Sequence, residues 1–600
     1  MGLDPRVVAT LDEAAWYAQA YRGDEPQLTV RAVATGLLLG FVFSFANVYI
    51  GLKTGWFFSM ALAASLASFA TWRVLTALAI ARRPLSILET SCMQSTASSA
   101  AYATGNMVVG VIPAMLLLSV SAAHPAGVQR HWLALAAWIA CIAALGVVLA
   151  IPLKRQLINR ERLAFPSGTA AAVMLHGLYQ AGADVKRRTR LLLVAIGASA
   201  LLPLVRDLRA GKLIPASSRA FDWLPTRPRP SEAGLVLDHS VLLVAAGVFV
   251  GLRTTAWMLV GGLVTAFALG PLALDAHVIA TPATAWLDVG IWIGAPLIVA
   301  YGLVALAGSW RAFARTFAAR DATAGDAGIE IPIRWFWFGF AACGTTAIVL
   351  GRAAFDIPIL LGALAVVTSL VFSAVACRIT GETDVTPGGP MGKLIQLAFG
   401  MLRPQHPTTN LMTAAMTHAS SVASADLLTD LKSGYLLGAN PRRQFAAQAI
   451  GILAGTAASV LAYFILIPDA TALTGPAPQF AAPGAHQFQA IAELLQHGLA
   501  SLAPLQRQLV VIGAIAGVVL ASVERLAPVR VRRWLPSTAG LGLGLLLPLA
   551  TSVSMVLGAA LAALFARREG GEDLVWPVAA GALAGESLAG VAVAIANNLT

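Results

Sequence analysis

Long apolar runs dominate the chain, and runs of roughly 20 such residues are what a helix needs to cross a bilayer. The clear runs lie near 31–51, 57–80, 106–122, 131–153, 189–207, 236–252, 255–272, 289–308, 335–352, 355–377, 444–467, 508–527 and 573–597. More ambiguous runs lie at 87–104, 164–180, 408–425, 487–503 and 538–565. The pattern predicts an all-α polytopic membrane protein with about 14 (about 12–16) transmembrane helices and some re-entrant segments.

Composition and charge agree with a membrane protein. Of the 600 residues, 58% are hydrophobic and 12% charged, whereas soluble domains carry roughly 25% charged residues. The net charge of +12 does not indicate a nucleic-acid partner, because the basic residues form short clusters between apolar runs, as in cytoplasmic loops. We therefore expect a multi-pass protein of the cell inner (plasma) membrane, in contact with the lipid bilayer and not with nucleic acid. A homodimer is a candidate assembly.

The chain divides into a polar N-terminal tail (1–30), a first membrane half (31–330) and a second (331–600). The tail lacks the basic start and short apolar core of a cleavable signal peptide, so we expect a solvated tail or surface helix. Short motifs recur in the same order in the two halves: 53–55 with 379–381, 97–99 with 419–421, and 166–167 with 536–537. The order suggests an internal duplication, as in many secondary transporters; chance similarity of such short motifs is the alternative.

Two segments, 164–180 and 538–565, carry basic clusters at both ends. Positive loops prefer one side of the membrane, so each segment is predicted to enter and return as a hairpin. Pro548 provides a turn near the middle of the second. A plain crossing that breaks the charge rule is the alternative.

The stretch from Thr380 to Arg443 holds acids, a lysine, a histidine and many Gly, Ser and Thr residues between apolar segments. Ionisable groups and broken backbone at membrane depth are costly and are tolerated where they line a cavity for polar cargo. This stretch therefore indicates a transporter.

An amphoteric cargo such as a peptide needs a cation for its carboxylate, and Lys53 and Lys393 sit beside glycines that could break helices. Snorkelling to the head groups is the alternative for Lys53. The predicted site is the meeting of Glu89–Tyr102 with Asn410–Asp426, closed off at Gly55 and Gly381. The candidate substrate-binding residues are Asn47, Tyr49, Lys53, Gln94, Ser98, Lys393, Asn410, Thr413, Thr417 and His418.

The same polar residues also fit a structural role. The Ser- and Thr-rich runs could serve tight helix packing through small residues instead of lining a cavity. His418 is a lone histidine, and such a residue is more often a hydrogen-bond partner than a proton relay.

Proton coupling requires a buried carboxylate that changes charge as the site opens and closes. The candidates lie beside small residues in or next to apolar segments: Glu89, Glu382, Glu586 and Asp426. The alternative is a structural acid, paired with Lys or Arg or capping a helix start. That alternative is favoured for Asp384 and Asp430.

Other classes of protein are less well supported. No Gly-x-x-x-x-Gly-Lys-Ser/Thr nucleotide loop is present, which argues against a primary pump. His-Glu-x-x-His is absent and the nine histidines do not cluster, which argues against a membrane metalloenzyme. Scattered acids and broken helices suit alternating access better than a channel. We expect no enzyme activity, cofactor or resident metal, and a small-molecule or peptide substrate moved together with protons.

The motifs, taken in order, resemble those of the oligopeptide transporter family, which includes the yellow-stripe-like metal-chelate transporters. The resemblance covers nearly the whole chain. The chain resembles the bacterial branch of the family more than the longer fungal branch. It implies proton-driven uptake of peptides or related amphoteric solutes, with uptake of metal chelates as the alternative. The matching segments are 28–32, 47–55, 89–105, 112–114, 165–170, 381–384, 426–438, 441–445 and 585–590.

Overall fold

The structure is a computed structural model. It describes residues 2–55, 57, 60–179, 183–207, 213–226, 228–279, 281–318, 329–383, 386, 388–474, 478–498, 502–532, 534–568 and 571–599. The α-helices up to residue 206 are α1 (Pro5–Val8), α2 (Glu13–Ala15), α3 (Val30–Thr54), α4 (Ala61–Ala77), α5 (Ile87–Ser98), α6 (Asn106–Val109), α7 (Val111–Leu118), α8 (Trp132–Leu149), α9 (Ile151–Lys154), α10 (Pro166–Tyr179) and α11 (Ala183–Arg206). Two short antiparallel strands follow, β1 (Ser217–Ser218) and β2 (Leu237–Asp238).

The later α-helices are α12 (Val241–Val250), α13 (Leu252–Val264), α14 (Gly270–Asp275), α15 (Ile291–Ala318), α16 (Ile333–Phe355), α17 (Ile359–Thr383), α18 (Gly388–Leu402), α19 (Pro407–Leu437), α20 (Pro441–Leu466), α21 (Pro483–His497), α22 (Pro504–Leu526), α23 (Val529–Arg532), α24 (Thr538–Leu546), α25 (Leu549–Ala566) and α26 (Glu572–Leu599). Short π-helices are η1 (Trp16–Ala20), η2 (Ser99–Ala103), η3 (Arg155–Arg160), η4 (Thr265–Leu269) and η6 (Trp286–Gly290). Short 3₁₀-helices are η5 (Pro282–Thr284) and η7 (Ala470–Leu473).

The predicted all-α polytopic architecture is confirmed. Within the described ranges, nine helical segments are long and apolar enough to cross a membrane: Val30–Lys53, Ile87–Leu118, Trp132–Arg160, Leu252–Asp275, Ile333–Phe355, Ile359–Gly381, Pro441–Leu466, Pro504–Leu526 and Leu549–Ala566. Shorter apolar helices cover Val241–Val250, Asp288–Tyr301, Met391–Leu402 and Leu574–Gly590. The total of about 14 spans stays a prediction.

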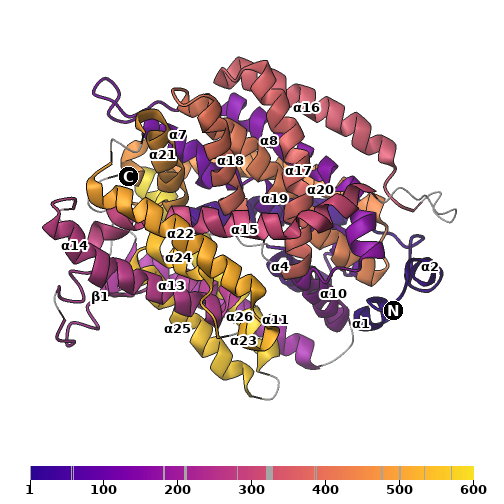
Figure 1. Cartoon of the computed structure of the whole chain (residues 1–600). Helices are drawn as coiled ribbons and strands as arrows, with labels where there is room; N and C mark the ends of the chain where they lie inside the picture. The colour runs from indigo at the N-terminus through magenta and orange to yellow at the C-terminus, as the bar shows by residue number, and fades with distance from the viewer. Residues whose placement is uncertain are drawn as a thin grey trace.

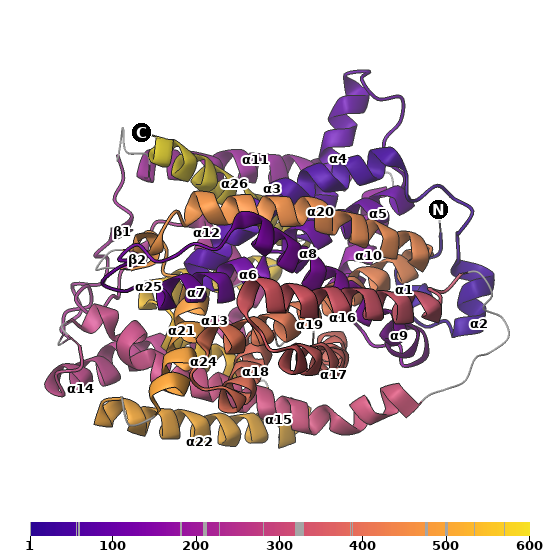
Figure 2. The same ribbon diagram turned by 90° about the horizontal axis from the view of Figure 1, so that it is seen from above.

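Helix α19 lies near the centre of the molecule (Figure 1), in contact with α5, α8, α10, α17 and α18. Its 31 residues give a length of about 46 Å. Small and polar residues occur all around it, so neighbouring helices approach closely: the backbone of Ser420 packs directly on Gly146 of α8. Figure 2 shows α15 beside α22 along one edge and α11 beside α26 along another.

Side-chain caps and glycines fix where the site-bearing helices begin and end. The Thr29 hydroxyl accepts a hydrogen bond from the Ala32 amide at the start of α3, and Asn440 caps α20 ahead of Pro441. Gly55 ends α3 and Gly438 ends α19, both with φ in the left-handed region (73° and 79°) that favours glycine. These ends place the polar residues of α3, α19 and α20 at fixed depths.

The hairpin predicted at 164–180 is wrong. Residues Pro166–Tyr179 form one uninterrupted helix of 14 residues, about 21 Å long and too short to cross a core of about 30 Å. Basic clusters at both of its ends therefore need not lie on opposite sides of the membrane. In the second segment the chain breaks where predicted, since α24 ends at Leu546 and α25 begins after Pro548.

A helix break at Gly381 is also not observed. Gly381 lies inside the last turn of α17, which continues to Thr383. Its carbonyl accepts a hydrogen bond from the Phe165 amide at 2.9 Å, so this glycine serves a close approach between α17 and the chain entering α10.

The N-terminal segment, expected to be a solvated tail or surface helix, forms short helices and is also fixed to the bundle by buried side chains. Trp16 is fully buried; its ring stacks on Tyr435 of α19 at 4.4 Å between centroids, and its Nε1 donates to the Tyr435 carbonyl. Lys154 forms an ion pair with Glu330 at 2.5 Å, and Tyr17 donates to the same carboxylate. Trp16 thus anchors this polar segment on the end of the central helix, and Tyr17 adds a second contact.

Candidate functional site

The two predicted polar runs do meet. Helix α5 and turn η2 pack against α19, and two side-chain hydrogen bonds join them: Ser98 Oγ donates to Asp426 Oδ1 at 2.8 Å, and Gln94 Nε2 donates to Asp430 Oδ1 at 3.2 Å. Gln94 also accepts a hydrogen bond from Ser65 of α4. Ser98 and Asp426, which are 328 positions apart in the sequence, are thereby brought into contact.

Asp426 and Asp430, named here the acid pair, lie one turn apart on α19 and are 4% and 1% exposed. The second oxygen of Asp426 accepts from Gln448 Nε2 at 3.0 Å, whereas Oδ2 of Asp430 accepts no hydrogen bond from any residue that the structure describes. Neither carboxylate has an ion pair with a lysine or arginine in the part of the chain that the structure describes. Burying two unpaired negative charges side by side is costly, and a bound proton removes that cost.

Sequence reasoning treated Asp430 as a structural acid and missed two glutamines of α20. Gln448 binds Asp426, and Gln444 donates to the Asp430 backbone carbonyl at 3.1 Å and to Ser91 Oγ. The signal was available, because two glutamines one turn apart in an apolar helix share a face, as do two aspartates one turn apart.

A second buried polar group, named the lysine cluster, joins α18, α19 and α21. Lys393 is 5% exposed and its Nζ donates to Gln487 Oε1; no carboxylate pairs with it among the described residues. Gln396 Nε2 lies 3.5 Å from Asn410 Oδ1, while Gln396 Oε1 and Asn410 Nδ2 have no partner within the described part of the chain. His418 is 6% exposed and borders the cluster at Gly392. A buried cation beside the unsatisfied Asn410 N–H donor suits the carboxylate of a ligand.

Glu89 is held at the start of α5 by several donors. Arg31 of α3 pairs with both carboxylate oxygens, with Nε–Oε1 at 2.8 Å, and Thr29 Oγ1 donates at 2.8 Å. Glu89 also completes a capping box with Ser86. This is the structural arrangement that sequence reasoning left open as the alternative.

Glu586 is similarly enclosed. Arg206 Nη1 and Ser240 Oγ donate to its Oε1 at 3.0 and 2.8 Å, and the Leu242 amide donates to its Oε2 at 2.7 Å. Arg206 also pairs with Asp207. Every oxygen of Glu586 is therefore satisfied in a network that joins α11, α12 and α26.

The predicted residues of α3 contact turn η2 and neighbouring aromatic rings. Asn47 Nδ2 donates to the Ala101 carbonyl at 2.9 Å and so fixes α3 on η2. Lys53 Nζ lies 4.9 Å from the centre of the Tyr49 ring, a cation–π contact at the half-buried end of α3. Tyr49 in turn packs edge-on against Phe480.

On α19, Thr413 donates back to the Thr409 carbonyl at 2.8 Å, and Thr417 lies 3.4 Å from Ser369 Oγ of α17. These contacts suit close helix packing. Glu382 belongs to the last turn of α17, but its side chain lies outside the described residues, as does Asp384, so their roles stay predictions.

Replacing Glu89 by Gln is expected to lower the stability of the fold. The amide would present N–H groups to Arg31 and Ser86, which are themselves donors, and lost charge-assisted hydrogen bonds are worth about 1.5–3 kcal/mol. Thermal unfolding of the purified protein measures the change. Glu25→Gln is the control, because its pair with Arg22 is partly exposed and worth about 1 kcal/mol or less. A Glu89→Gln protein that unfolds at the same temperature as the wild type would contradict this structural role.

No three His, Cys, Asp or Glu side chains gather as metal ligands in the ranges that the structure describes. The acid pair lies on the central helix α19 and the lysine cluster packs against it from α18 and α21; neither has an oppositely charged partner among the described residues.

This combination defines a multi-pass membrane protein with ionisable groups buried among its helices, the class to which transporters belong. The chain belongs to the family described as OPT oligopeptide transporter protein, which it matches over residues 27–597. This family membership identifies a transporter rather than an enzyme.

Individual relatives are distant. A candidate oligopeptide transporter of Saccharomyces cerevisiae is 24% identical over 553 residues, covering 71% of this chain and 76% of that protein. A candidate metal-nicotianamine transporter of Oryza sativa is 24% identical over 659 aligned positions, covering 98% and 92%. A candidate oligopeptide transporter of Haemophilus influenzae is 28% identical over 275 residues, covering 44% and 38%.

Proposed function

We propose that the protein is a proton-coupled symporter of the inner (plasma) membrane that takes up oligopeptides or related amphoteric solutes. The observation that carries the proposal is the acid pair. Its carboxylates are buried at the contact of α5, α19 and α20, with amide and hydroxyl donors but without a cation among the described residues. Opening of that contact to water would favour the charged form, and closure the protonated form.

The lysine cluster supports an acidic group on the cargo. Lys393 Nζ and Asn410 Nδ2, which has no hydrogen-bond partner among the described residues, could donate to a carboxylate. His418, which borders the lysine cluster, lies eight residues before Asp426 on α19, a distance of about 12 Å along the helix axis. Proton site and carboxylate site would thus lie at different depths along one helix, arranged between two related halves of the chain.

The charge distribution favours an orientation. The N-terminal ends of α5 and α20 lie together, as Gln444 bonds Ser91. Arg31, Arg155 and Arg443 bond partners at the same end. Because positive charge collects on the cytoplasmic side, we infer that this end and the N-terminus face the cytoplasm.

Uptake of metal chelates is the second candidate. It is favoured by the match to a candidate metal-nicotianamine transporter over 98% of the chain, and an anionic chelate could also use Lys393. Assignment to the bacterial branch of the family remains part of the proposal, supported by the Haemophilus relative over 44% of the chain.

Reconstituted vesicles test the proposal directly. Proteoliposomes with an acidic exterior are given di- to pentapeptides, with and without chelated iron. We expect a subset of these solutes to accumulate, and a proton ionophore to abolish the accumulation. A one-unit pH difference drives about tenfold accumulation per coupled proton. Uptake that ignores both the pH difference and the ionophore would refute proton coupling; absence of uptake for every solute would refute the cargo class.

A further inference from the structure

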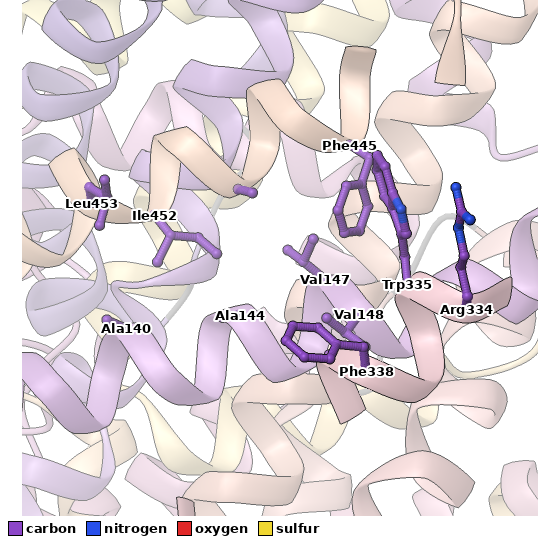
Figure 3. Close-up of a pocket in the computed structure, with 12 residues that line it drawn as sticks. Ala140, Ala144, Val147, Val148, Arg334, Trp335, Phe338, Phe445, Ile452 and Leu453 are labelled. Atoms are coloured by element: carbon purple, nitrogen blue, oxygen red, sulfur yellow. The ribbon is translucent and has the colours of Figure 1, made fainter. Parts of the chain in front are cut away.

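An apolar groove of about 750 Å³ lies away from the acid pair and the lysine cluster, between α16 and α20 with α8 as its floor. Each of the three helices belongs to a segment able to cross the membrane, so the groove opens at membrane depth. Figure 3 shows the side chains that line it. They are Ala140, Ala144, Val147, Val148, Arg334, Trp335, Phe338, Gly339, Phe445, Ala449, Ile452 and Leu453.

One end of the groove is aromatic and positively charged. Trp335 and Phe445 meet there at 5.7 Å between ring centroids, and Arg334 extends past them (Figure 3). The Arg334 guanidinium forms no ion pair or hydrogen bond with any described residue. The nearby Arg442 and Arg443, in contrast, donate to the backbone carbonyls of the chain and are used by the fold.

Two helix starts reinforce this charge. Helix α16 begins at Ile333 and α20 at Pro441, so the positive ends of both helix dipoles lie at the Arg334 end. Trp335 is 38% exposed and Phe338 79% exposed. Tryptophan and a snorkelling arginine are typical of the membrane interface, where apolar chains meet charged head groups.

We propose that the groove binds a phospholipid with an anionic head group. One acyl chain lies along Val147, Val148 and Ile452, and the phosphate sits on Arg334. Charge complementarity favours this occupant over a second copy of the chain, because an apolar groove with a cation at one end matches an acyl chain joined to a phosphate.

Native mass spectrometry tests the proposal after the protein is reconstituted in vesicles of equal parts phosphatidylglycerol and phosphatidylcholine. We expect the wild type to retain phosphatidylglycerol about five- to tenfold over phosphatidylcholine. Arg334→Gln should lose that preference. Ala449→Phe, which fills the groove from exposed Ala449, should lose retention of both lipids.

Arg352→Gln is the matched control, since Arg352 lies near the other end of the same helix, is paired with Asp356 and is outside the groove. It should retain phosphatidylglycerol as the wild type does. Equal retention of the two lipids by the wild type, or an unchanged preference in Arg334→Gln, overturns the proposal. Dimers that hold no lipid and dissociate in Ala449→Phe would show that a second copy covers the groove instead.

Discussion

Asp426→Asn is expected to abolish proton-driven accumulation while leaving substrate exchange across the membrane. Asparagine keeps the size of the side chain and an acceptor for Ser98, but its amide does not titrate and so cannot carry the coupled proton. With a one-unit pH difference, the wild type should accumulate substrate about tenfold per coupled proton. The variant should reach equal concentrations on both sides and continue to exchange labelled for unlabelled substrate in counterflow.

Asp430→Asn tests whether both carboxylates of the acid pair are needed for proton coupling. Both single variants should lose coupling if the two carboxylates share one proton, because either substitution removes the shared site. Asp356→Asn is the control, as Asp356 is exposed at the end of α16. Should Asp426→Asn and Asp430→Asn both keep tenfold accumulation, the coupling acid lies elsewhere, and Glu382 is then the next residue to replace.

Lys393→Gln is expected to weaken substrate affinity by about 10- to 100-fold, the factor that corresponds to a lost charge-assisted hydrogen bond of about 1.5–3 kcal/mol. The effect should be specific for the carboxylate of the cargo. The wild type should bind a peptide acid more tightly than the same peptide with a C-terminal amide, and Lys393→Gln should bind the two equally. Competition for uptake in proteoliposomes measures both affinities.

Lys53→Gln separates the two lysine candidates. Lys53 contacts the Tyr49 ring at a half-buried helix end, so we expect Lys53→Gln to keep the preference for the acid over the amide. If Lys53→Gln loses the preference and Lys393→Gln keeps it, the carboxylate binds at the end of α3. The Gln487 side chain, which accepts from Lys393 in this structure, would then be only a structural partner.

Local pattern was sufficient to predict the membrane class, most helices and the contact between the polar runs of α5 and α19. It was insufficient for the charge partners. Arg31 lies 58 residues from Glu89, and Arg206 lies 380 residues from Glu586, so neither partner could be found near its acid in sequence. Ion pairs across helices depend on tertiary packing, which hydrophobic spacing does not encode.

Asp430 shows the opposite case, in which helix geometry alone held the answer. Lys432 follows two residues later, but positions two apart on a helix do not face each other, whereas Asp426 and Asp430 do. The predicted hairpin at 164–180 failed for a related reason. The charge rule concerns segments that cross the bilayer, and α10 is too short to do so.

The burial of Trp16 against Tyr435 also constrains the order of biosynthesis. The two residues are 419 positions apart, and at about 5–20 residues per second a ribosome needs roughly 20 to 80 s to make the intervening chain. During that time Trp16 lacks its partner on α19, although Arg155 and Glu330, the partners of Glu13 and Tyr17, have already been synthesised. Closure of this end of the bundle is thus a late step of assembly, and chains stalled before residue 435 should expose the N-terminal segment to proteases that the finished protein resists.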